Sequence, residues 1–342
     1  MKPTMKAIAQ RANVSEGTVS NVINNRKGVS EKTARRILEI AEDMGYLEHR
    51  SESNKSRSIR YIVYKKYGSD TSQTAFYTDM IEEIERICRS QHFDLMIRYV
   101  IAGRDNLEES VRSIMSDDLA GLIIQATEME AEELRCFHLL HLPTVVVDHY
   151  LPDELYDFVQ IDFKRGAYLA TKYLIQKGHT EIGILNRTVD IRSGRLRQEG
   201  FSAALREGGI QENPAYHYGL DSTLDGSYRD MCGLLREDRP MPTAFLAYND
   251  AMAFGAMRAL NESGYSVPDR VSIIGFDDMP FCEISHPRLT TMKSYNREIG
   301  KIAAMRLLTR IRHPDVPRVK IDVDMDLIER ESVAKPTVRK QP

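Results

Sequence analysis

Short apolar runs alternate along most of the chain with longer segments in which apolar residues recur every three to four positions. The runs are typical of buried β-strands, and the longer segments are typical of amphipathic helices. The first series has predicted strands at 61–64, 95–97, 122–124 and 145–147, with helices at about 76–90, 107–115 and 131–140 between them. Strands that alternate with helices predict a parallel sheet with helices on both faces.

A second series of the same kind starts at Ile161. Its predicted strands are 182–185, 244–247 and 271–274, and its helices are 163–176, 196–207 and about 251–262. Two such sheets in one chain predict an α/β body of two doubly wound parallel-sheet lobes that face each other across a cleft. Ligands of open parallel sheets bind at the carboxyl ends of the strands, so the cleft is the expected ligand site.

The first 46 residues follow a different pattern, which predicts an all-α head of three short helices. Thr4 is the expected N-cap of a helix at about 5–12, and a second helix follows at about 16–24. Ser30 is the expected N-cap of a third helix, which ends at Gly45. This third helix carries apolar residues at helical spacing: Ala34, Ile37, Leu38 and Ala41.

The second helix of the head has one apolar and one polar face. Val19, Val22 and Ile23 form a stripe that we expect to pack on the first helix, on Ile8 and Ala9. The opposite face has short polar positions: Glu16, Gly17, Ser20, Asn21 and Asn24. Such a face can reach base edges and phosphates in a major groove. The alternative is an ordinary three-helix surface.

The charge distribution separates the head from the body. Residues 1–60 hold 12 Lys and Arg against 7 Asp and Glu, whereas the remaining residues hold 35 against 43. A basic head on an acidic body is the layout of a protein whose head meets a polyanion. A solvated basic terminus would produce the same imbalance.

The head contains a series of short motifs: TMKAIA (4–9), ANVSEGTVS (12–20), VIN (22–24), VS (29–30) and GY (45–46). In this order they resemble the head of the LacI/GalR family of bacterial transcription repressors. The resemblance implies a helix-turn-helix DNA-binding domain at 1–46 in which Glu16, Gly17 and Asn21 read bases. It also implies phosphate contacts by Thr4, Ser15, Thr18, Ser20 and Asn24. Because Asn21 favours adenine and Gly17 offers no side chain, we expect an unusual operator half-site.

The segment 47–59 departs from the family pattern. Family members have a Pro and a Leu in a hinge helix that forms on DNA, but Glu48 and Lys55 occupy these two positions here. The segment is rich in Ser and charged residues, which predicts a flexible linker. We expect Arg50, Lys55 and Arg57 to contact DNA phosphates instead, which would give a salt-sensitive complex.

The body also resembles this family over some 270 residues. The motifs are Asp162-x3-Gly166-Ala167, Gly178-His179, Arg197-x2-Gly200-Phe201, Asn249-Asp250, GFDD (275–278), LTT (289–291) and IERES (328–332). The resemblance implies a fold like that of periplasmic sugar-binding proteins, with an effector-binding and dimerisation domain at 60–334 and a tail at 335–342. The chain would cross between the lobes near residues 160, 290 and 320. This assigns about 60–160 and 291–320 to the first lobe and about 161–290 and 321–334 to the second.

By position, the family's effector contacts fall on Asp148, Arg197, Asn249 and Asp277. Asn, Asp and Arg can each make paired hydrogen bonds to polyol hydroxyls. Phe276 is a candidate for stacking on a sugar face, although a hinge or core role fits it equally. For Arg197 and Asp277 the alternative is a surface ion pair or a strand-end cap. The neighbouring Asp250 and Asp278 fit helix caps or interlobe contacts better than ligand contacts.

Several function classes are not expected from the sequence. No His is paired with a nucleophile, no metal-ligand spacing occurs, and no P-loop or dinucleotide-binding motif is present, so we expect neither an enzyme nor a bound metal or cofactor. The four scattered cysteines fit reduced thiols. There is neither a long apolar run nor an apolar segment after the start, so we expect a cytoplasmic protein with no membrane contact.

The functional prediction is a ligand-responsive repressor of a carbohydrate-utilisation operon. A homodimer would place two heads on a pseudo-palindromic double-stranded operator. A small sugar or phosphosugar between the lobes would shift the DNA affinity, as inducer or as co-repressor. The alternative is a regulator controlled mainly by a protein co-effector, as in catabolite control. The C-terminal tail has no leucine heptad, so a zipper-made tetramer is not expected.

Overall fold

The computed structural model describes residues 4–23, 29–44, 46, 57–67, 74–115, 117–237 and 239–336. The chain divides into two compact units, a head that runs to Arg57 and a body that starts at Ser58. Among the predicted DNA contacts, Asn24, Arg50 and Lys55 lie outside the described residues, as does the predicted helix end at Gly45.

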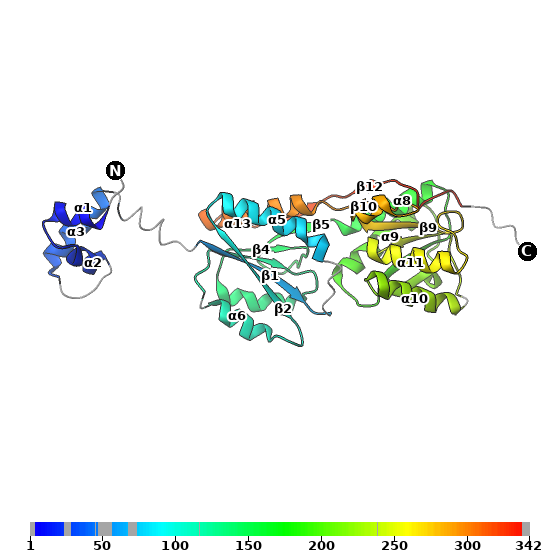
Figure 1. Ribbon diagram of the computed structural model, residues 1–342, viewed down its shortest axis with the longest axis horizontal. Coiled ribbons are helices and arrows are strands. Elements are labelled where there is room, and N and C mark those ends of the chain that lie inside the picture. Colours follow the sequence, from blue (N-terminus) through cyan, green and yellow to red (C-terminus); the bar gives the residue numbers. More distant parts are fainter. Residues whose placement is uncertain are drawn as a thin grey trace, which may run out of the picture. The chain divides into compact units, whose positions relative to one another are not determined.

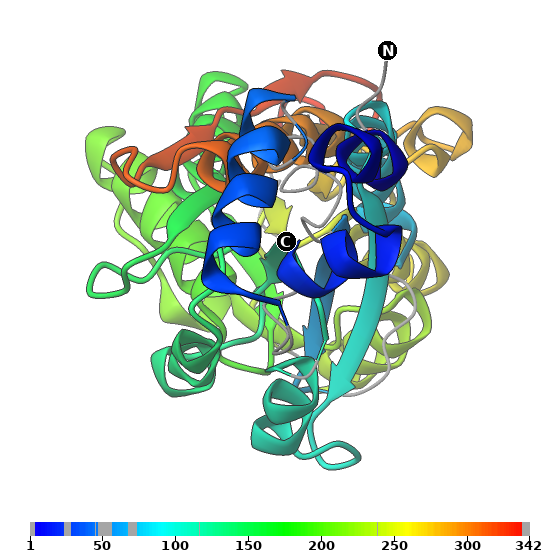
Figure 2. The same ribbon diagram turned by 90° about the vertical axis from the view of Figure 1, so that its left-hand side faces the viewer.

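The head contains the three predicted helices, α1 (Met5–Ala12), α2 (Glu16–Ile23) and α3 (Glu31–Asp43) (Figure 2). Both predicted N-caps form, because Thr4 Oγ1 accepts from the Ala7 N–H and Ser30 Oγ accepts from the Thr33 N–H. The helices enclose a small core of Ile8, Ala9, Ala12, Val19, Ile37 and Ala41. Leu38 was expected on the apolar face of α3, but 41% of it is exposed, because the core-facing stripe runs through Ile37 and Ala41.

The first lobe of the body is a parallel six-stranded sheet in the order β11-β5-β4-β3-β1-β2. Its strands are β1 (Ser58–Lys65), β2 (Asp94–Ile101), β3 (Gly121–Gln125), β4 (Thr144–Val147), β5 (Asp157–Ile161) and β11 (Lys320–Val323). Helices α5 (Thr74–Ser90) and α13 (Asn296–Arg312) lie on one face (Figure 1). Helices α6 (Leu107–Met115) and α7 (Ala131–Arg135) and the 3-10 helix η1 (Cys136–Leu140) cover the other face. The predicted helix at 131–140 is thus α7 followed by η1.

The second lobe has a six-stranded sheet in the order β12-β10-β9-β8-β6-β7, parallel except for the pair β10–β12. Its strands are β6 (Ile182–Arg187), β7 (His217–Leu220), β8 (Ala244–Ala247), β9 (Ser272–Asp277), β10 (Thr290–Lys293) and β12 (Asp326–Ile328). Helices α8 (Phe163–Gln176) and α9 (Arg192–Glu207) pack on one face, and α10 (Leu224–Arg236) and α11 (Asp250–Glu262) pack on the other. Two shorter elements are the 3-10 helix η2 (Pro214–Tyr216) and α12 (Phe281–Ile284).

The chain passes between the lobes at three places. These are the junctions of β5 with α8, of β10 with α13, and of β11 with β12. The second and third crossings come after Lys293 and Val323, slightly beyond the expected positions near 290 and 320, because β10 completes the second sheet and β11 the first. Three connections of this kind let two lobes hinge about a common axis. Among the described residues, no helix is long and apolar enough to cross a membrane.

Candidate functional site

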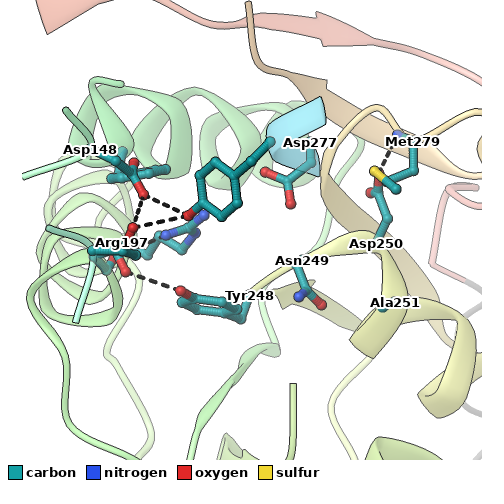
Figure 3. Close-up of a pocket in the computed structure, with 12 residues that line it drawn as sticks. Asp148, Arg197, Tyr248, Asn249, Asp250, Ala251, Asp277 and Met279 are labelled. Carbon is teal, nitrogen blue, oxygen red and sulfur yellow. Dashed lines mark hydrogen bonds between the residues drawn. The ribbon is translucent and has the colours of Figure 1, made fainter. Parts of the chain in front are cut away.

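The carboxyl ends of strands from both lobes meet around a cavity (Figure 3). Asp148 follows β4 in the first lobe, whereas Asn249 follows β8 and Asp277 ends β9 in the second lobe. The residues that line the cavity are Tyr77, Thr127, Asp148, Phe163, Ser193, Arg197, Tyr248, Asn249, Asp250, Ala251, Asp277 and Met279. The site is therefore shared between the lobes, as expected for two facing parallel sheets.

Arg197 is the one charged residue of α9 that lines this cavity, and only 3% of it is exposed. Its guanidinium carbon lies 4.1 Å from the ring centroid of Phe163, 4.3 Å from that of Tyr248 and 4.2 Å from that of Phe276. Nη1 donates to the Ser193 carbonyl at 3.1 Å, and Nε has no hydrogen-bond partner among the described residues. Three aromatic faces thus replace part of the hydration of a cation that forms no ion pair with any described carboxylate.

Asp148 is held from its own lobe by two hydroxyl groups. Its Oδ2 accepts from Tyr77 Oη at 2.8 Å and from Thr127 Oγ1 at 2.6 Å, whereas Oδ1 is buried without a partner. Burial raises the pKa of Asp148, while the two hydroxyl donors and the charge of Arg197 oppose this rise. The free Oδ1 can therefore accept a hydrogen bond from a ligand in the cavity.

Asp277 is partly buried, and its carboxylate has fewer hydrogen bonds than that of Asp148. Its Oδ1 is buried and has no hydrogen-bond partner in the described part of the chain. Burial holds the pKa of Asp277 well above its usual range, the charges of Asp250 and Asp148 add to the effect, and Arg197 opposes it. Its backbone has φ +115°, and that of Asp148 has φ +61°, both in the left-handed region that side chains other than glycine rarely adopt. Such strain persists only where the surrounding structure enforces it, and it concentrates at binding sites.

Asp250 also reaches the cavity, but its carboxylate is fully used. It accepts from Thr291 Oγ1 at 2.6 Å, from the Met279 N–H at 2.8 Å and from Cys282 Sγ at 3.1 Å. Burial raises the pKa of Asp250 to about 6 against these donors. Asp250 therefore anchors the segment after β9, which fits neither of the predicted roles of helix cap and interlobe contact.

The sequence-predicted contacts fall into two groups. Asp148, Arg197, Asn249 and Asp277 line one cavity. Phe276 is fully buried, does not line the cavity, and packs on Arg197 and on Phe163, with which its ring centroid distance is 6.2 Å.

Asn249 has a structural task of its own, because it caps α11. Its Oδ1 accepts from the Met252 N–H at 2.8 Å, and its Nδ2 donates to the Ser222 carbonyl at 3.2 Å. Asp278 pairs with Arg330 at 2.7 Å within the second lobe.

Four lining residues with hydroxyl groups were not predicted from the sequence: Tyr77, Thr127, Ser193 and Tyr248. Ser193 lies four residues before Arg197 on α9, and its Oγ is 3.0 Å from Tyr248 Oη. That helical spacing was a usable signal for Ser193. Tyr248 directly precedes Asn249 at a strand end, which was a weaker signal. Nothing in the sequence pattern pointed to the other two.

The lobes touch beside the cavity as well. Arg187 at the end of β6 forms an ion pair with Glu128, which follows β3, at 3.4 Å, and both side chains are largely buried. Glu128 Oε2 also accepts from the Lys66 and Tyr67 N–H groups at the end of β1. The cavity enclosed between the lobes has a volume of only about 40 Å³, which is room for a few water molecules but not for a sugar. The described arrangement is therefore a closed one in the sense that the space between the lobes is narrower than a sugar requires.

The head places the three predicted base-reading positions on one helix. Glu16 and Gly17 are exposed at the start of α2, and Asn21 is partly exposed one turn later. A Cβ added at Gly17 would meet only Ser15 Oγ, at 3.7 Å, so packing within the head does not require glycine here.

The predicted phosphate contacts in the head include helix caps. Ser15 Oγ accepts from the Thr18 N–H at 3.1 Å and lies 2.8 Å from Thr18 Oγ1, and Thr4 caps α1. Arg57 is exposed immediately before β1. Among the described residues, no group of three or more His, Cys, Asp or Glu side chains is placed to hold a metal ion.

Comparison with known proteins agrees with this two-part architecture. Residues 4–48 match the model for bacterial regulatory proteins of the lacI family, and residues 171–333 match a periplasmic binding protein-like domain. The chain is 30% identical over 334 residues to the HTH-type transcriptional repressor PurR of Pasteurella multocida, covering 96% of this chain and 98% of the relative. It is 31% identical to the PurR repressor of Haemophilus influenzae, with the same shares covered.

Several solved structures of transcriptional regulators have a fold similar to that of this chain. A complex of the transcriptional regulator CelR with cellobiose has a TM-score of 0.73 and 25% identity, over 96% of this chain and 99% of that one. A LacI family regulator from Enterococcus faecium with bound ribose has a TM-score of 0.70 and 27% identity, over 82% and 100%. The lac repressor dimer bound to operator and the anti-inducer ONPF matches with a TM-score of 0.72 at 24% identity, over 98% and 100%, a likeness of fold.

Proposed function

The chain belongs to the LacI family of bacterial regulatory proteins, and from this premise we propose that it is a repressor whose operator affinity is set by a small polar effector bound between its lobes. The observation that carries the proposal is the set of unpaired groups in the closed cleft. Asp148 Oδ1, Asp277 Oδ1 and Arg197 Nε are all buried without a partner. Leaving each one unsatisfied costs about 1–3 kcal/mol, so a ligand that pairs with them stabilises the closed arrangement.

The hydrogen-bonding pattern describes the effector. Two carboxylates require donors from the ligand, and Arg197 requires an acceptor. A polyol meets this requirement, since each hydroxyl group both donates and accepts. Ribose and cellobiose are bound by two of the similar structures. Among Asp148, Arg197, Asn249 and Asp277, we assign the main effector contacts to the two aspartates and the arginine, with Asn249 contributing through the second N–H of its amide.

A planar nitrogen heterocycle is the second candidate for the effector. The aromatic side chains of Tyr77, Phe163 and Tyr248 line the same cavity, and ring N–H groups would satisfy the carboxylates. The names of the PurR relatives do not mention a sugar, so these relatives do not favour a sugar over a heterocycle. Control by a protein co-effector, the alternative expected from the sequence, receives no support from these similar proteins.

For DNA we propose that α2 enters the major groove. Glu16, Gly17 and Asn21 would then face base edges. The proposed phosphate contacts are Thr4, Ser15, Thr18, Ser20, Asn24, Arg50, Lys55 and Arg57. A homodimer on a pseudo-palindromic operator completes the proposal, in line with the lac repressor dimer that was solved on its operator.

The proposal is tested by titrating the full-length protein with pentoses, hexoses, disaccharides and purine bases in a calorimeter. We expect one class to bind, and Arg197→Gln to weaken that binding at least 100-fold. The exposed Asp153→Asn serves as the matched control, because Asp153 lies outside the cavity. Binding that survives in Arg197→Gln would contradict the proposed site.

A further inference from the structure

A second group of polar atoms without partners adjoins the effector cavity. His149 follows Asp148 in the first lobe and is only 3% exposed, and no described residue is a hydrogen-bond partner of its Nε2. Arg192 opens α9 in the second lobe, and its buried Nε has no partner either. The guanidinium carbon of Arg192 lies 5.9 Å from the ring centroid of Tyr150, which places the start of α9 against the segment 148–150 of the opposite lobe.

This region concentrates positive charge. The N-terminus of a helix is the positive end of its dipole, yet the first turn of α9 contains Arg192 and Arg195 and no acidic residue. Its N-cap, Ile191, provides no side-chain acceptor. Arg195 is compensated by Asp190 at 2.9 Å and by Glu130 at 3.9 Å. Arg192 forms no ion pair within the described part of the chain.

The positive charges of Arg192 and Arg195 also act on the imidazole of His149. Burial lowers the pKa of the His149 imidazole to about 4, and the charges of Arg192 and Arg195 add to the effect. The imidazole is thus held neutral between the lobes, with one ring nitrogen unsatisfied. An anion at this place would supply what all three groups lack: an acceptor for Arg192, a partner for His149 and a counter-charge for the helix end.

We propose that the start of α9, Arg192 and His149 form an anion subsite that receives a phosphate ester carried by the effector. The inference rests on the proposed function, because the subsite continues the same cleft. Ser193 and Asp148 both line the effector cavity. Ser193 is the residue after Arg192, and Asp148 is the residue before His149. The centre of the cavity has the opposite character, since Asp148, Asp250 and Asp277 repel an anion. A phosphorylated polyol therefore binds in one orientation, with its hydroxyl groups on the aspartates and its phosphate against α9.

The test uses the full-length protein and starts with inorganic phosphate as the probe. Phosphate should raise the unfolding midpoint of the wild type more than chloride at equal ionic strength does. Arg192→Gln should lose this difference. Arg206→Gln, an exposed residue in the last turn of the same helix, removes the same charge and should keep it. His149→Gln is a second variant that should also lose it, in case Arg192→Gln folds poorly.

Matched pairs then separate free phosphate from a phosphorylated effector. For ribose and ribose 5-phosphate, glucose and glucose 6-phosphate, and fructose and fructose 6-phosphate, at least one ester should bind tenfold or more tightly than its parent sugar. In Arg192→Gln that ester and its parent should bind equally. A phosphate effect that Arg192→Gln retains, or no ester that gains over its parent, overturns the subsite.

The outcomes also distinguish the two proposals. A parent sugar that binds in an Arg197-dependent manner without any gain from phosphate leaves the proposed function standing and removes only the subsite. If a ligand binds the wild type and Arg197→Gln with the same affinity, the proposed function itself is contradicted.

Discussion

Asp277 combines burial, an unpaired carboxylate oxygen and a left-handed backbone at one position. Each of these features costs stability, and no hydrogen bond to its Oδ1 offsets the cost. The charges of Asp148 and Asp250 make the ionised form of Asp277 less favourable still. A residue of this kind is explained by binding and not by folding.

Asp277→Asn should therefore stabilise the ligand-free protein and abolish its effector response. At pH 7.5 we expect the free energy of unfolding to rise by about 1–3 kcal/mol, because a neutral amide replaces a poorly solvated carboxylate and Asn tolerates a positive φ better than most residues. Urea unfolding measures the change, and Asp153→Asn is the exposed control. A variant that is less stable than the wild type at pH 7.5 would contradict this account.

The stabilisation by Asp277→Asn should also depend on pH. The pKa of Asp277 is raised in the folded protein, so the destabilisation that Asp277 contributes is absent below its unfolded-state pKa, near 4, and is fully developed once the pH has risen through the higher folded pKa. The advantage of the variant should accordingly shrink as the pH falls from 7.5 towards 4. Urea unfolding at several pH values checks this, and an advantage that is constant with pH would rule out the proposed cause.

At the level of residues, the sequence predicts the cavity only in part. Asp148, Arg197, Asn249 and Asp277 were predicted because polar residues at the carboxyl ends of strands, or at family positions, converge by topology. Tyr77 and Thr127 enter through the pairing of α5 and β3 with the rest of the first lobe. That is tertiary information, which local spacing does not contain. Phe276 was ambiguous because an apolar residue at a strand end can face the core or the cleft.

Among the elements, the crossing of α8 and α9 is the tightest helix contact near the site. Gly200 of α9 lies against the backbone of α8, and a Cβ there would collide with the Lys164 carbonyl oxygen. Because α9 carries both Arg192 and Arg197, a shift of this helix would move both proposed ligand contacts.

Gly200→Ala should destabilise the protein by several kcal/mol and weaken effector binding. The added methyl group meets fixed backbone, which cannot yield as a flexible side chain would. Gly233→Ala in α10 is the matched control, because nothing lies within 4 Å of its added Cβ. The control should gain about 0.5–1 kcal/mol from helix propensity. Thermal unfolding measures both, and equal effects of the two substitutions would show that the helix crossing is looser than described.

The reading face of α2 gives a prediction of its own. Gly17→Ala is free of steric conflict in the head and should stabilise α2 by about 1 kcal/mol. If position 17 faces a base, the added methyl group should change the operator preference at one base pair of each half-site, with thymine favoured there. Selection of binding sites from random DNA with the wild type and the variant checks this. An unchanged preference would place Gly17 away from the bases.

The strength of the sequence signal differed among elements. The helices and strands predicted between residues 61 and 274 were correct in kind, although some strands, such as β1 and β2, extend further than predicted. The sequence analysis predicted none of β7, α10, β10, α13, β11 and β12. His217–Leu220 is a short strand interrupted by Gly219, and α10 contains Gly226 and Gly233, which weaken a helical pattern. The apolar residue Leu38 was expected in the core of the head, but the position of α3 against α1 and α2 leaves it exposed.

At the scale of the whole molecule, favourable and unfavourable interactions oppose each other when the two lobes of the body close. Five unsatisfied polar atoms belong to the two facing surfaces: Asp148 Oδ1, His149 Nε2, Arg192 Nε, Arg197 Nε and Asp277 Oδ1. Against them stand the interlobe ion pairs of Glu128 with Arg187 and of Glu130 with Arg195. A ligand that satisfies the five atoms shifts the balance towards the closed arrangement.

Glu128→Gln should weaken effector binding without removing a ligand contact, because Glu128 does not line the cavity. Loss of the interlobe pair makes closure less favourable, and we expect a decrease in affinity on the order of tenfold, equivalent to about 1.4 kcal/mol. Calorimetry measures the affinity, with Glu132→Gln, an exposed residue of α7, as the control. Unchanged affinity in Glu128→Gln would mean that the pair does not govern closure.

The central claim is that one ligand in the cleft sets the affinity of the head for DNA. It is tested most directly by measuring operator binding of the full-length protein by fluorescence anisotropy, with and without saturating effector, in the wild type and in Arg197→Gln. We predict that the effector changes the operator affinity of the wild type by a factor of about 5–150, and that operator changes the effector affinity by the same factor. Arg197→Gln should bind operator as the effector-free wild type does and show no response. An effector that occupies the wild type without changing its operator affinity, or a response that persists in Arg197→Gln, would contradict the account.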